Sequence, residues 1–329
     1  MKAPDYFWTP GHPLALLLWP LSRIFAAVSA LRRFAYRIGL FSVHRLPVPV
    51  VVVGNISVGG AGKTPLVIWL VNHLRDSGWR PGVISRGYGG RGGSGQRQVQ
   101  ADSDPADVGD EPVLIARRTG GPVAVAPRRV AAGQHLLEHT ECDILVADDG
   151  LQHYALGRDL EIAVVDGRRG LGNGLLLPAG PLREGRWRLD QVDLVVGNGG
   201  SGRGHRLRPS LGEPTSLVTG ERLPLEKLRG QRVHAVAGVG NPQAFFDMLM
   251  DQGIEVVGHA FPDHHAFAAE DILFEDALPV LMTEKDAVKC FPIAAEKHWY
   301  LPLRVQPDAD FIGRLDRALQ RIRRGQETP

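Results

Sequence analysis

The sequence predicts an α/β protein in which helices cover a parallel sheet that carries a phosphate-binding loop. Short apolar runs alternate with stretches of helical period along most of the chain, which is typical of parallel strands joined by right-handed crossovers. A glycine-rich segment that ends in Gly62-Lys63-Thr64 separates an early apolar run from the helix-like stretch after it. Two carboxylates, Asp148 and Asp149, close a later apolar run. At 329 residues the chain has room for two domains.

The strand before the glycine-rich segment and the helix after it have clear periods. Val50 to Val53 form a β-branched run, which indicates a strand buried on both faces. Residues 66–74 carry apolar side chains at helical spacing. Glycines between the two let successive backbone N–H groups converge on phosphate oxygens at the helix N-terminus. The candidate phosphate-binding glycines are Gly59, Gly60 and Gly62.

Lys63 and Thr64 complete this candidate nucleotide site. The lysine would reach the terminal phosphates of a nucleotide, and the threonine hydroxyl would bind Mg²⁺. The motif G-x-x-x-x-G-K-[ST] expects glycine where this chain has Ser57, and Gly59 and Gly60 can supply the missing flexibility. The alternative is a glycine-rich turn that binds nothing. The strand before it and the helix after it favour nucleotide binding.

The overall composition excludes little by itself. A net charge of +2 does not argue for nucleic acid, and neither a basic stripe nor interleaved aromatic residues support it. Cys142 and Cys290 lie far apart and lack the spacing of metal ligands. They therefore indicate structural thiols in a reducing compartment.

The apolar segment 13–37 is unusual for a soluble enzyme. It lacks the basic leader and cleavage site of a secretory signal, and Pro20 and Arg23 disfavour a spanning helix. We expect an amphipathic helix in the membrane interface, where arginines meet anionic headgroups. A helix packed on the protein's own core is the alternative. The expected apolar anchors are Trp19, Phe25, Leu31 and Phe34, and the expected headgroup contacts are Arg23, Arg32, Arg33 and Arg37.

The rest of the chain suggests two α/β units and a linker. Residues 89–107 are rich in Gly, Ser, Gln and Asp and indicate a mobile surface loop. The aperiodic stretch 198–216 indicates the linker between the units. The expected division is a membrane-associated helix at 1–40, a P-loop NTPase-like domain at 41–200, a linker at 201–217 and a smaller α/β domain at 218–329.

Asp148 and Asp149 stand where a carboxylate that holds Mg²⁺ belongs in such a domain, at the end of a strand downstream of the phosphate loop. Without the phosphate loop, a solvated Asp-Asp-Gly turn would be the better interpretation. Adjacent residues point in different directions, so we expect one of the two to bind the metal and the other to meet the substrate.

Phosphoryl transfer also needs a base and positive charge around the reacting group. Asp110 lies at a loop-to-helix turn, and His264 and His265 follow a strand of the second unit. A histidine held by a carboxylate could form a base dyad across the domain cleft. Arg183 and Glu184 offer a phosphate clamp and a polar partner. Each of these, taken alone, is more often a solvated loop charge or a helix cap.

Seven motifs together resemble the tetraacyldisaccharide 4'-kinase family, the lipid A 4'-kinases of Gram-negative bacteria. They occur in order from the N-terminal helix to about residue 290, and Ser57 belongs to this family's version of the loop. The motifs lie at 54–65 (GNISVGGAGKTP), 85–89 (SRGYG), 108–112 (VGDEP), 148–153 (DDGLQH), 178–184 (PAGPLRE), 261–264 (FPDH) and 283–289 (TEKDAVK).

The resemblance implies a membrane-associated kinase with ATP and Mg²⁺ as cofactors. It would transfer the γ-phosphate to the 4'-hydroxyl of tetraacyldisaccharide 1-phosphate, a lipid, at the cytoplasmic face of the inner membrane. No nucleic acid or protein partner is expected. The implied catalytic residues are Asp110, His264 and Asp149, and Asp110 takes the proton. His264 is chosen over His265 because the family motif reads Phe-x-Asp-His. Lys63 and Thr64 would bind phosphates, Thr64, Asp148 and Asp149 the metal, and Arg86, Glu111, His153, Arg183 and Glu184 would surround the reacting groups.

A competing hypothesis is a membrane-associated NTPase switch, whose hydrolysis drives partner exchange. Its deviant loop, Lys-Gly-Gly-x-Gly-Lys-Thr, needs lysine at position 58, which is Val58 here. Such a switch would hydrolyse ATP without a lipid acceptor, whereas the kinase would do so only slowly.

Overall fold

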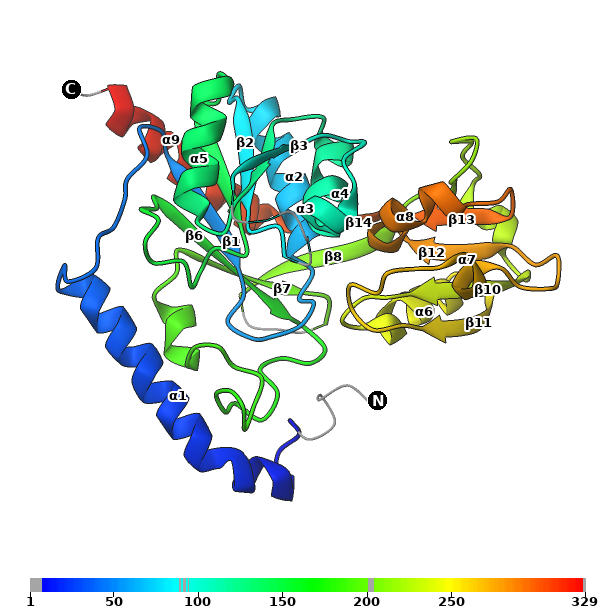
Figure 1. The fold of residues 1–329 in the computed structure, drawn as a ribbon, viewed down its shortest axis with the longest axis horizontal. Helices are drawn as coiled ribbons and strands as arrows, with labels where there is room; N and C mark the ends of the chain where they lie inside the picture. The colour runs from blue at the N-terminus through cyan, green and yellow to red at the C-terminus, as the bar shows by residue number, and fades with distance from the viewer. Residues whose placement is uncertain (1–7, 89, 91–92, 94, 201–203, 328–329) are drawn as a thin grey trace.

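The chain forms two sheets of unequal size in the computed structural model, which describes residues 8–88, 90, 93, 95–200 and 204–327 (Figure 1). The strands of the larger sheet are β1 (Val50–Gly54), β2 (Pro81–Ser85), β3 (Arg97–Val99), β4 (Val123–Val125), β5 (Ile144–Asp148), β6 (Leu160–Asp166), β7 (Leu194–Asn198), β8 (His205–Leu211) and β14 (Leu303–Pro307). Their order is β14-β8-β7-β6-β1-β5-β2-β4-β3. The two edge strands, β3 and β14, run antiparallel to their neighbours, and the strands between them pair in parallel.

The smaller sheet belongs to the second α/β unit. Its strands are β9 (Thr215–Ser216), β10 (Arg232–Ala237), β11 (Glu255–Ala260), β12 (Val280–Thr283) and β13 (His298–Leu301), in the order β11-β10-β12-β13-β9. Only the short β9 pairs antiparallel among these described strands. The α/β class expected from the alternating pattern is confirmed, with two parallel-dominated sheets.

Helices pack on both faces of the larger sheet. The helices of the described chain are α1 (Pro13–Arg37), α2 (Lys63–Asp76), α3 (Pro105–Val108), α4 (Asp110–Thr119), α5 (Arg129–His139), α6 (Pro242–Met250), α7 (Ala269–Ile272), α8 (Glu284–Cys290) and α9 (Ala309–Glu327). Helices α2, α4 and α9 share one apolar cluster with the larger sheet, whereas α5 belongs to the cluster on its opposite face. The sheet is therefore covered on both faces, as a parallel sheet requires.

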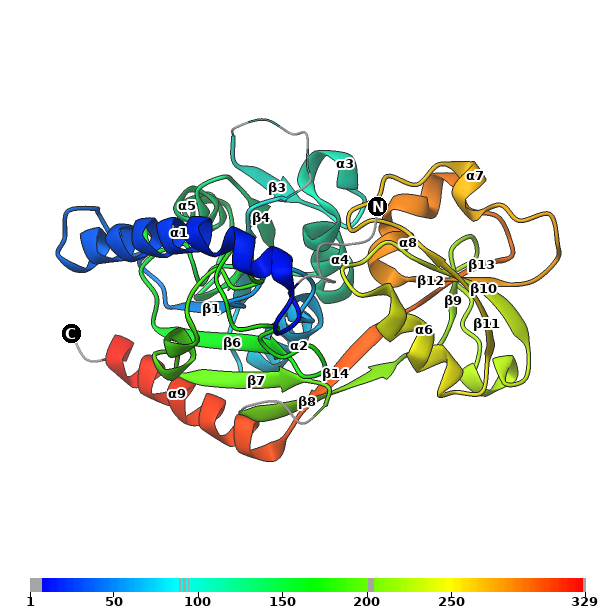
Figure 2. The ribbon, with the colours of Figure 1, turned by 90° about the horizontal axis from the view of Figure 1, so that it is seen from below.

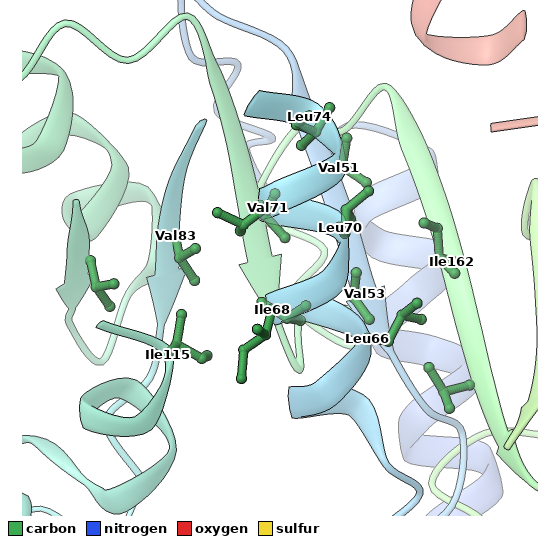
Figure 3. Close-up of a cluster of buried hydrophobic side chains, with 14 of the residues drawn as sticks. Val51, Val53, Leu66, Ile68, Leu70, Val71, Leu74, Val83, Ile115 and Ile162 are labelled. Atoms are coloured by element: carbon green, nitrogen blue, oxygen red, sulfur yellow. The ribbon is translucent and has the colours of Figure 1, made fainter. Parts of the chain in front are cut away.

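The strand β1 and the helix α2 form the centre of the larger unit. Val51 and Val53 face α2, where they meet Leu66 and Leu70 (Figure 3). Val50 and Val52 belong to the cluster on the other face. All residues of β1 are buried, which is the two-sided burial that the β-branched run predicts.

Two expectations about connecting segments are wrong. The segment 201–217, expected as a linker, contains β8, which pairs with β7 and β14 in the larger sheet. After the second unit the chain returns to the first through β14 and α9, so the larger sheet also includes residues from the expected second domain (Figure 2). The expected loop at 89–107 contains β3 and α3; its residues 89, 91, 92 and 94 lie outside the described residues.

Helix α1 lies along one side of the molecule (Figure 1). Its apolar side chains are largely exposed, including Leu16, Leu17, Ile24 and Leu31. Its length and composition would allow it to cross a membrane. The core-packing alternative is therefore not what the structure shows, because few of its side chains are buried.

Candidate active site

A cavity of about 1630 Å³ lies where the carboxyl ends of the larger sheet's strands face loops of the second unit. Parallel sheets bind ligands at this edge, because the loops after adjacent strands diverge there. Residues on its wall come from the phosphate loop, from α1 and from the second unit; they include Gly59, Gly60, Gly62, Lys63, Thr64, Phe25, Arg32, Arg86, Asp149, Asp263, His264 and Lys285.

The phosphate loop has a conformation that requires glycine at Gly62. This residue precedes α2 with φ of 79°, a left-handed region that disfavours other residues. A Cβ added there would lie 1.9 Å from Nδ2 of Asn198, which donates a hydrogen bond to the carbonyl of Ala61. Arg169 donates to the carbonyl of Gly60 on the other side. The loop is thus held from the ends of β6 and β7, with its backbone directed at the cavity.

The carboxylates that end β5 have opposite environments. Asp148 is 1% exposed, and neither of its oxygens has a hydrogen-bond partner within the described part of the chain. Burial, with Glu111 and Asp149 nearby, raises the pKa of Asp148 to about 7. Asp149 lies 3.4 Å from Nζ of Lys63 and 3.0 Å from Nη1 of Arg183. Burial alone would raise its pKa, but these two cations lower it to about 2.

The donor set around Asp148 fits Mg²⁺. This ion prefers oxygen ligands and is commonly bound by one or two carboxylates together with substrate phosphates. Among the residues that the structure describes, no group of three His, Cys, Asp or Glu side chains could hold a metal alone. Asp148, with oxygens unpartnered within the described chain, lies near Lys63, and Asp149 and the hydroxyl of the buried Thr64 supply further oxygens beside the phosphate loop.

Asp110 and His264 meet across the two units. Nδ1 of His264 lies 3.0 Å from both carboxylate oxygens of Asp110. His265 instead contacts Asp271 within its own unit, at 3.0 Å. His264 has a φ of 61°, a strained conformation for a residue with a side chain, and such strain often marks functional sites. The backbone therefore directs His264, rather than its neighbour, toward Asp110.

Both members of this pair have shifted pKa values. Burial opposes ionisation of Asp110, but the His264 hydrogen bond and the charges of Lys285 and Lys289 hold its pKa below 3.8. The same hydrogen bond raises the pKa of His264 above 6.5, against burial and the charge of Lys285. Asp110 also opens α4, where the helix dipole favours negative charge.

The five other candidate substrate residues all line the cavity: Arg86, Glu111, His153, Arg183 and Glu184. Burial and nearby arginines lower the pKa of His153 to about 4, so its imidazole is neutral at pH 7. Glu184 is buried and accepts hydrogen bonds from Gln152, at 2.8 Å, and from Tyr154.

Three further residues of the site, Arg129, Gln152 and Tyr154, have no role assigned from the sequence, although Gln152 lies within the motif at 148–153. Arg129 is buried at the start of α5 and donates to the carbonyl of Asp149, at 2.8 Å. Gln152 and Tyr154 hold Glu184. The position of Arg129 just after β4, at the carboxyl edge of the sheet, is the one signal that could have indicated it.

Helix α1 reaches the site as well. Phe25, expected as a membrane anchor, is half-buried and lines the cavity together with Val28 and Arg32. The guanidinium of Arg33 stacks 3.6 Å over the ring of Trp187, and Ser22 donates to the carbonyl of Leu176. The helix therefore contributes Phe25, Val28 and Arg32 to the cavity wall, while other apolar side chains of the helix are exposed.

Known proteins resemble this chain over nearly its whole length. Residues 14–320 match the family model described as tetraacyldisaccharide-1-P 4'-kinase. A tetraacyldisaccharide 4'-kinase of Nitrosococcus oceani is 52% identical over 93% of this chain and 90% of its own length. One from Pseudomonas putida is 47% identical over 96% of both. The crystal structure of LpxK from Aquifex aeolicus in complex with ATP superposes with a TM-score of 0.79, at 29% identity, over 94% of this chain and 99% of that one.

Proposed function

Because this chain belongs to the tetraacyldisaccharide-1-phosphate 4'-kinase family, we propose that its two units divide the work of phosphoryl transfer at the cavity between them. The enzyme transfers the γ-phosphate of ATP to the 4'-hydroxyl of tetraacyldisaccharide 1-phosphate and so forms the 4'-phosphorylated lipid A precursor. ATP and Mg²⁺ are its cofactors. The observation that supports the proposed division is the Asp110–His264 contact between the units.

The larger unit holds the nucleotide. Backbone N–H groups of the Gly59–Gly62 loop and the N-terminus of α2 bind phosphate oxygens, and Lys63 reaches the terminal phosphates. Thr64, Asp148 and Asp149 hold Mg²⁺, which supplies neutralisation of the phosphate charge when bound. Asp149 is shared between Lys63 and Arg183, so it also fixes the spacing of two cations around the transferred group.

The Asp110–His264 pair takes the proton of the acceptor hydroxyl. Asp110 is ionised at neutral pH, since its pKa lies below 3.8, so it is free to accept the proton as transfer proceeds. His264 lines the cavity and orients the carboxylate through its Nδ1–H. Developing charge on the hydroxyl oxygen makes even a weak base effective when it is well positioned.

The remaining charged residues surround the acceptor. Arg86 and Arg183 supply positive charge for the lipid phosphate and the transferred group. Glu111, His153 and Glu184 lie where sugar hydroxyls would enter, and the neutral imidazole of His153 can both donate and accept a hydrogen bond.

Helix α1 attaches the enzyme to the inner membrane. Its exposed Leu and Ile side chains bury in the interface, and its exposed arginines contact anionic headgroups. The cavity-facing side of the same helix would then meet a lipid acceptor without the acceptor leaving the bilayer. The attachment faces the cytoplasm, where ATP is available.

The test compares Asp110→Asn with His264→Gln in detergent, with Mg-ATP and tetraacyldisaccharide 1-phosphate. Asp110→Asn should lose about three orders of magnitude in kcat, as removal of a general base does, while ATP affinity stays near that of the wild type. His264→Gln should lose less, because Asp110 remains. A His264→Gln variant that is more impaired than Asp110→Asn would contradict the assignment of Asp110 as acceptor.

A further inference from the structure

Lys285 occupies the point where the two units meet at the Asp110–His264 pair. It lies in the first turn of α8, which packs against α4 of the other unit (Figure 2). Its Nζ is 3.0 Å from Oε1 of Glu111 and 3.0 Å from Oδ1 of Asp263, and 4.0 Å from Oδ2 of Asp110. The side chain is only 15% exposed. One ammonium group thus lies among three carboxylates from both units.

The two shorter contacts connect Lys285 to each half of the dyad. Glu111 follows Asp110 in the first turn of α4. Asp263 precedes His264, and its Oδ1 accepts hydrogen bonds both from Lys285 and from the backbone N–H of His264, at 3.1 Å. Lys285 therefore links the turn that presents His264 to the helix that presents Asp110.

We propose that Lys285 is a positioning residue for phosphoryl transfer: by bridging Glu111 and Asp263 it holds His264 against Asp110 across the two units. The inference rests on the proposed role of the Asp110–His264 pair. Without the ammonium group, Glu111, Asp263 and Asp110 repel one another. That repulsion moves the strained His264 turn away from α4.

Lys289, one turn further along α8, does not bridge the two units in this way. Its Nζ is 2.9 Å from Oδ1 of the fully buried Asp286. Asp286 also accepts hydrogen bonds from the backbone of Gly238 and the hydroxyl of Thr283. Lys289 lies 3.7 Å from Asp110 and contributes charge there, but its close partner belongs to its own unit. It has no ion pair with the His264 turn among the described residues.

The same interface offers a matched control. Arg118, near the end of α4, forms an ion pair of 2.7 Å with Glu284 of α8. This pair also connects the two units, yet among the described residues neither Arg118 nor Glu284 forms a hydrogen bond or ion pair with Asp110 or His264. Arg118→Met therefore removes an equivalent bridge without touching the dyad.

The experiment measures steady-state kinetics and the pKa of His264 in the full-length enzyme. The variants are Lys285→Met, Lys285→Gln as a gentler replacement should Lys285→Met not fold, and Arg118→Met. The imidazole C2–H resonance of His264, assigned through its loss in His264→Gln, is followed over a pH titration by NMR. Within the described chain, Asp110 and Asp263 form ion pairs with this ring, Lys285 and Lys289 form ion pairs with Asp110, and the ring of Tyr88 packs beside His264.

The pKa readout separates positioning from charge alone. The hydrogen bond to Asp110 is the largest cause that raises the pKa of His264, whereas the charge of Lys285 lowers it. If Lys285 positions the ring, its loss breaks that hydrogen bond, and the pKa of His264 falls toward 6.5. If Lys285 acted only through charge, its loss would raise the pKa further.

We expect kcat to fall about a hundredfold in Lys285→Met, as misplacement by about 1 Å can cause, with KM for ATP nearly unchanged and the pKa of His264 lowered. Arg118→Met should match the wild type in both. An equal loss of kcat in Lys285→Met and Arg118→Met, or a pKa of His264 that rises or stays constant in Lys285→Met, would overturn the inference. Wild-type turnover in Asp110→Asn would instead refute the proposed dyad, while the pKa of His264 would still report what Lys285 does.

Discussion

Replacing Asp148 by asparagine should make the metal-free protein more stable while it abolishes phosphoryl transfer. Asp148 is buried, and its oxygens have no hydrogen-bond partner in the described chain. Its charge is therefore unfavourable until a cation arrives. Asparagine keeps the shape of the side chain and removes its charge. The variant should therefore gain stability and lose its ability to bind the metal.

The magnitude follows from the pKa. The pKa of Asp148 rises from 3.8 to about 7 on folding, a change of about 3 units and so on the order of 4 kcal/mol. For a carboxylate with a raised folded pKa, stability is fully present below pH 3.8 and is lost as the pH rises through about 7. The unpartnered amide of asparagine costs about 1–3 kcal/mol. The net gain at pH 8 is then about 1–3 kcal/mol, or about 5 °C in Tm.

The assay is thermal unfolding of wild type and Asp148→Asn without Mg²⁺, at pH 8 and pH 5. We expect the variant to unfold at higher temperature at pH 8 and the advantage to vanish at pH 5, where Asp148 is protonated in the folded protein. Mg-ATP should reverse the order at pH 8. The adjacent Asp149→Asn should destabilise instead, because Asp149 is paired with Lys63 and Arg183. A lower Tm for Asp148→Asn at pH 8, or a difference independent of pH, would refute the reasoning.

Three further predictions concern the phosphate loop, α1 and the dyad. Gly62→Ala should weaken ATP binding, measured by calorimetry, because its Cβ would lie 1.9 Å from Nδ2 of Asn198 at a φ of 79°. A double variant that also carries Asn198→Ala should recover part of the lost affinity. No recovery would argue against the steric explanation. Leu17→Asp with Leu31→Asp should reduce co-sedimentation with anionic vesicles and leave ATP affinity in detergent unchanged; undiminished sedimentation would count against membrane binding through α1. The pKa of His264 is raised on folding, so the protonated ring stabilises the folded protein. The stability lost in His264→Gln should therefore be greatest below pH 6.5 and should disappear as the pH rises through the folded pKa. A stability difference in thermal unfolding that grows with pH would contradict this.

The sequence predicts those parts of the fold that depend on local chemistry. The β-branched run Val50 to Val53 favours a strand buried on both faces, and the glycines after it disfavour a continuous helix. Because parallel strands end at one edge, residues at strand ends such as Asp149 and Lys63 could be expected to meet, and they lie 3.4 Å apart.

Features that depend on distant partners could not be predicted in this way. β8 carries Pro209 and alternating arginines, a composition typical of a linker. It is a strand because β14, which follows the whole second unit in the sequence, pairs with it. The ion pair between Lys285 and Glu111 joins residues 174 positions apart. Arg129 is buried at the start of α5, although the local sequence there is typical of a solvent-exposed helix N-terminus.

The measurement that tests the central claim most directly is transfer of labelled γ-phosphate from Mg-ATP, in detergent, with and without tetraacyldisaccharide 1-phosphate. The product is identified by mass and by ³¹P NMR, and wild type is compared with Asp110→Asn. The account predicts a lipid-dependent product that carries a new phosphate on the 4'-oxygen and that collapses in Asp110→Asn. ATP turnover indifferent to the lipid, with no phosphorylated lipid formed, would contradict it and would favour an NTPase switch.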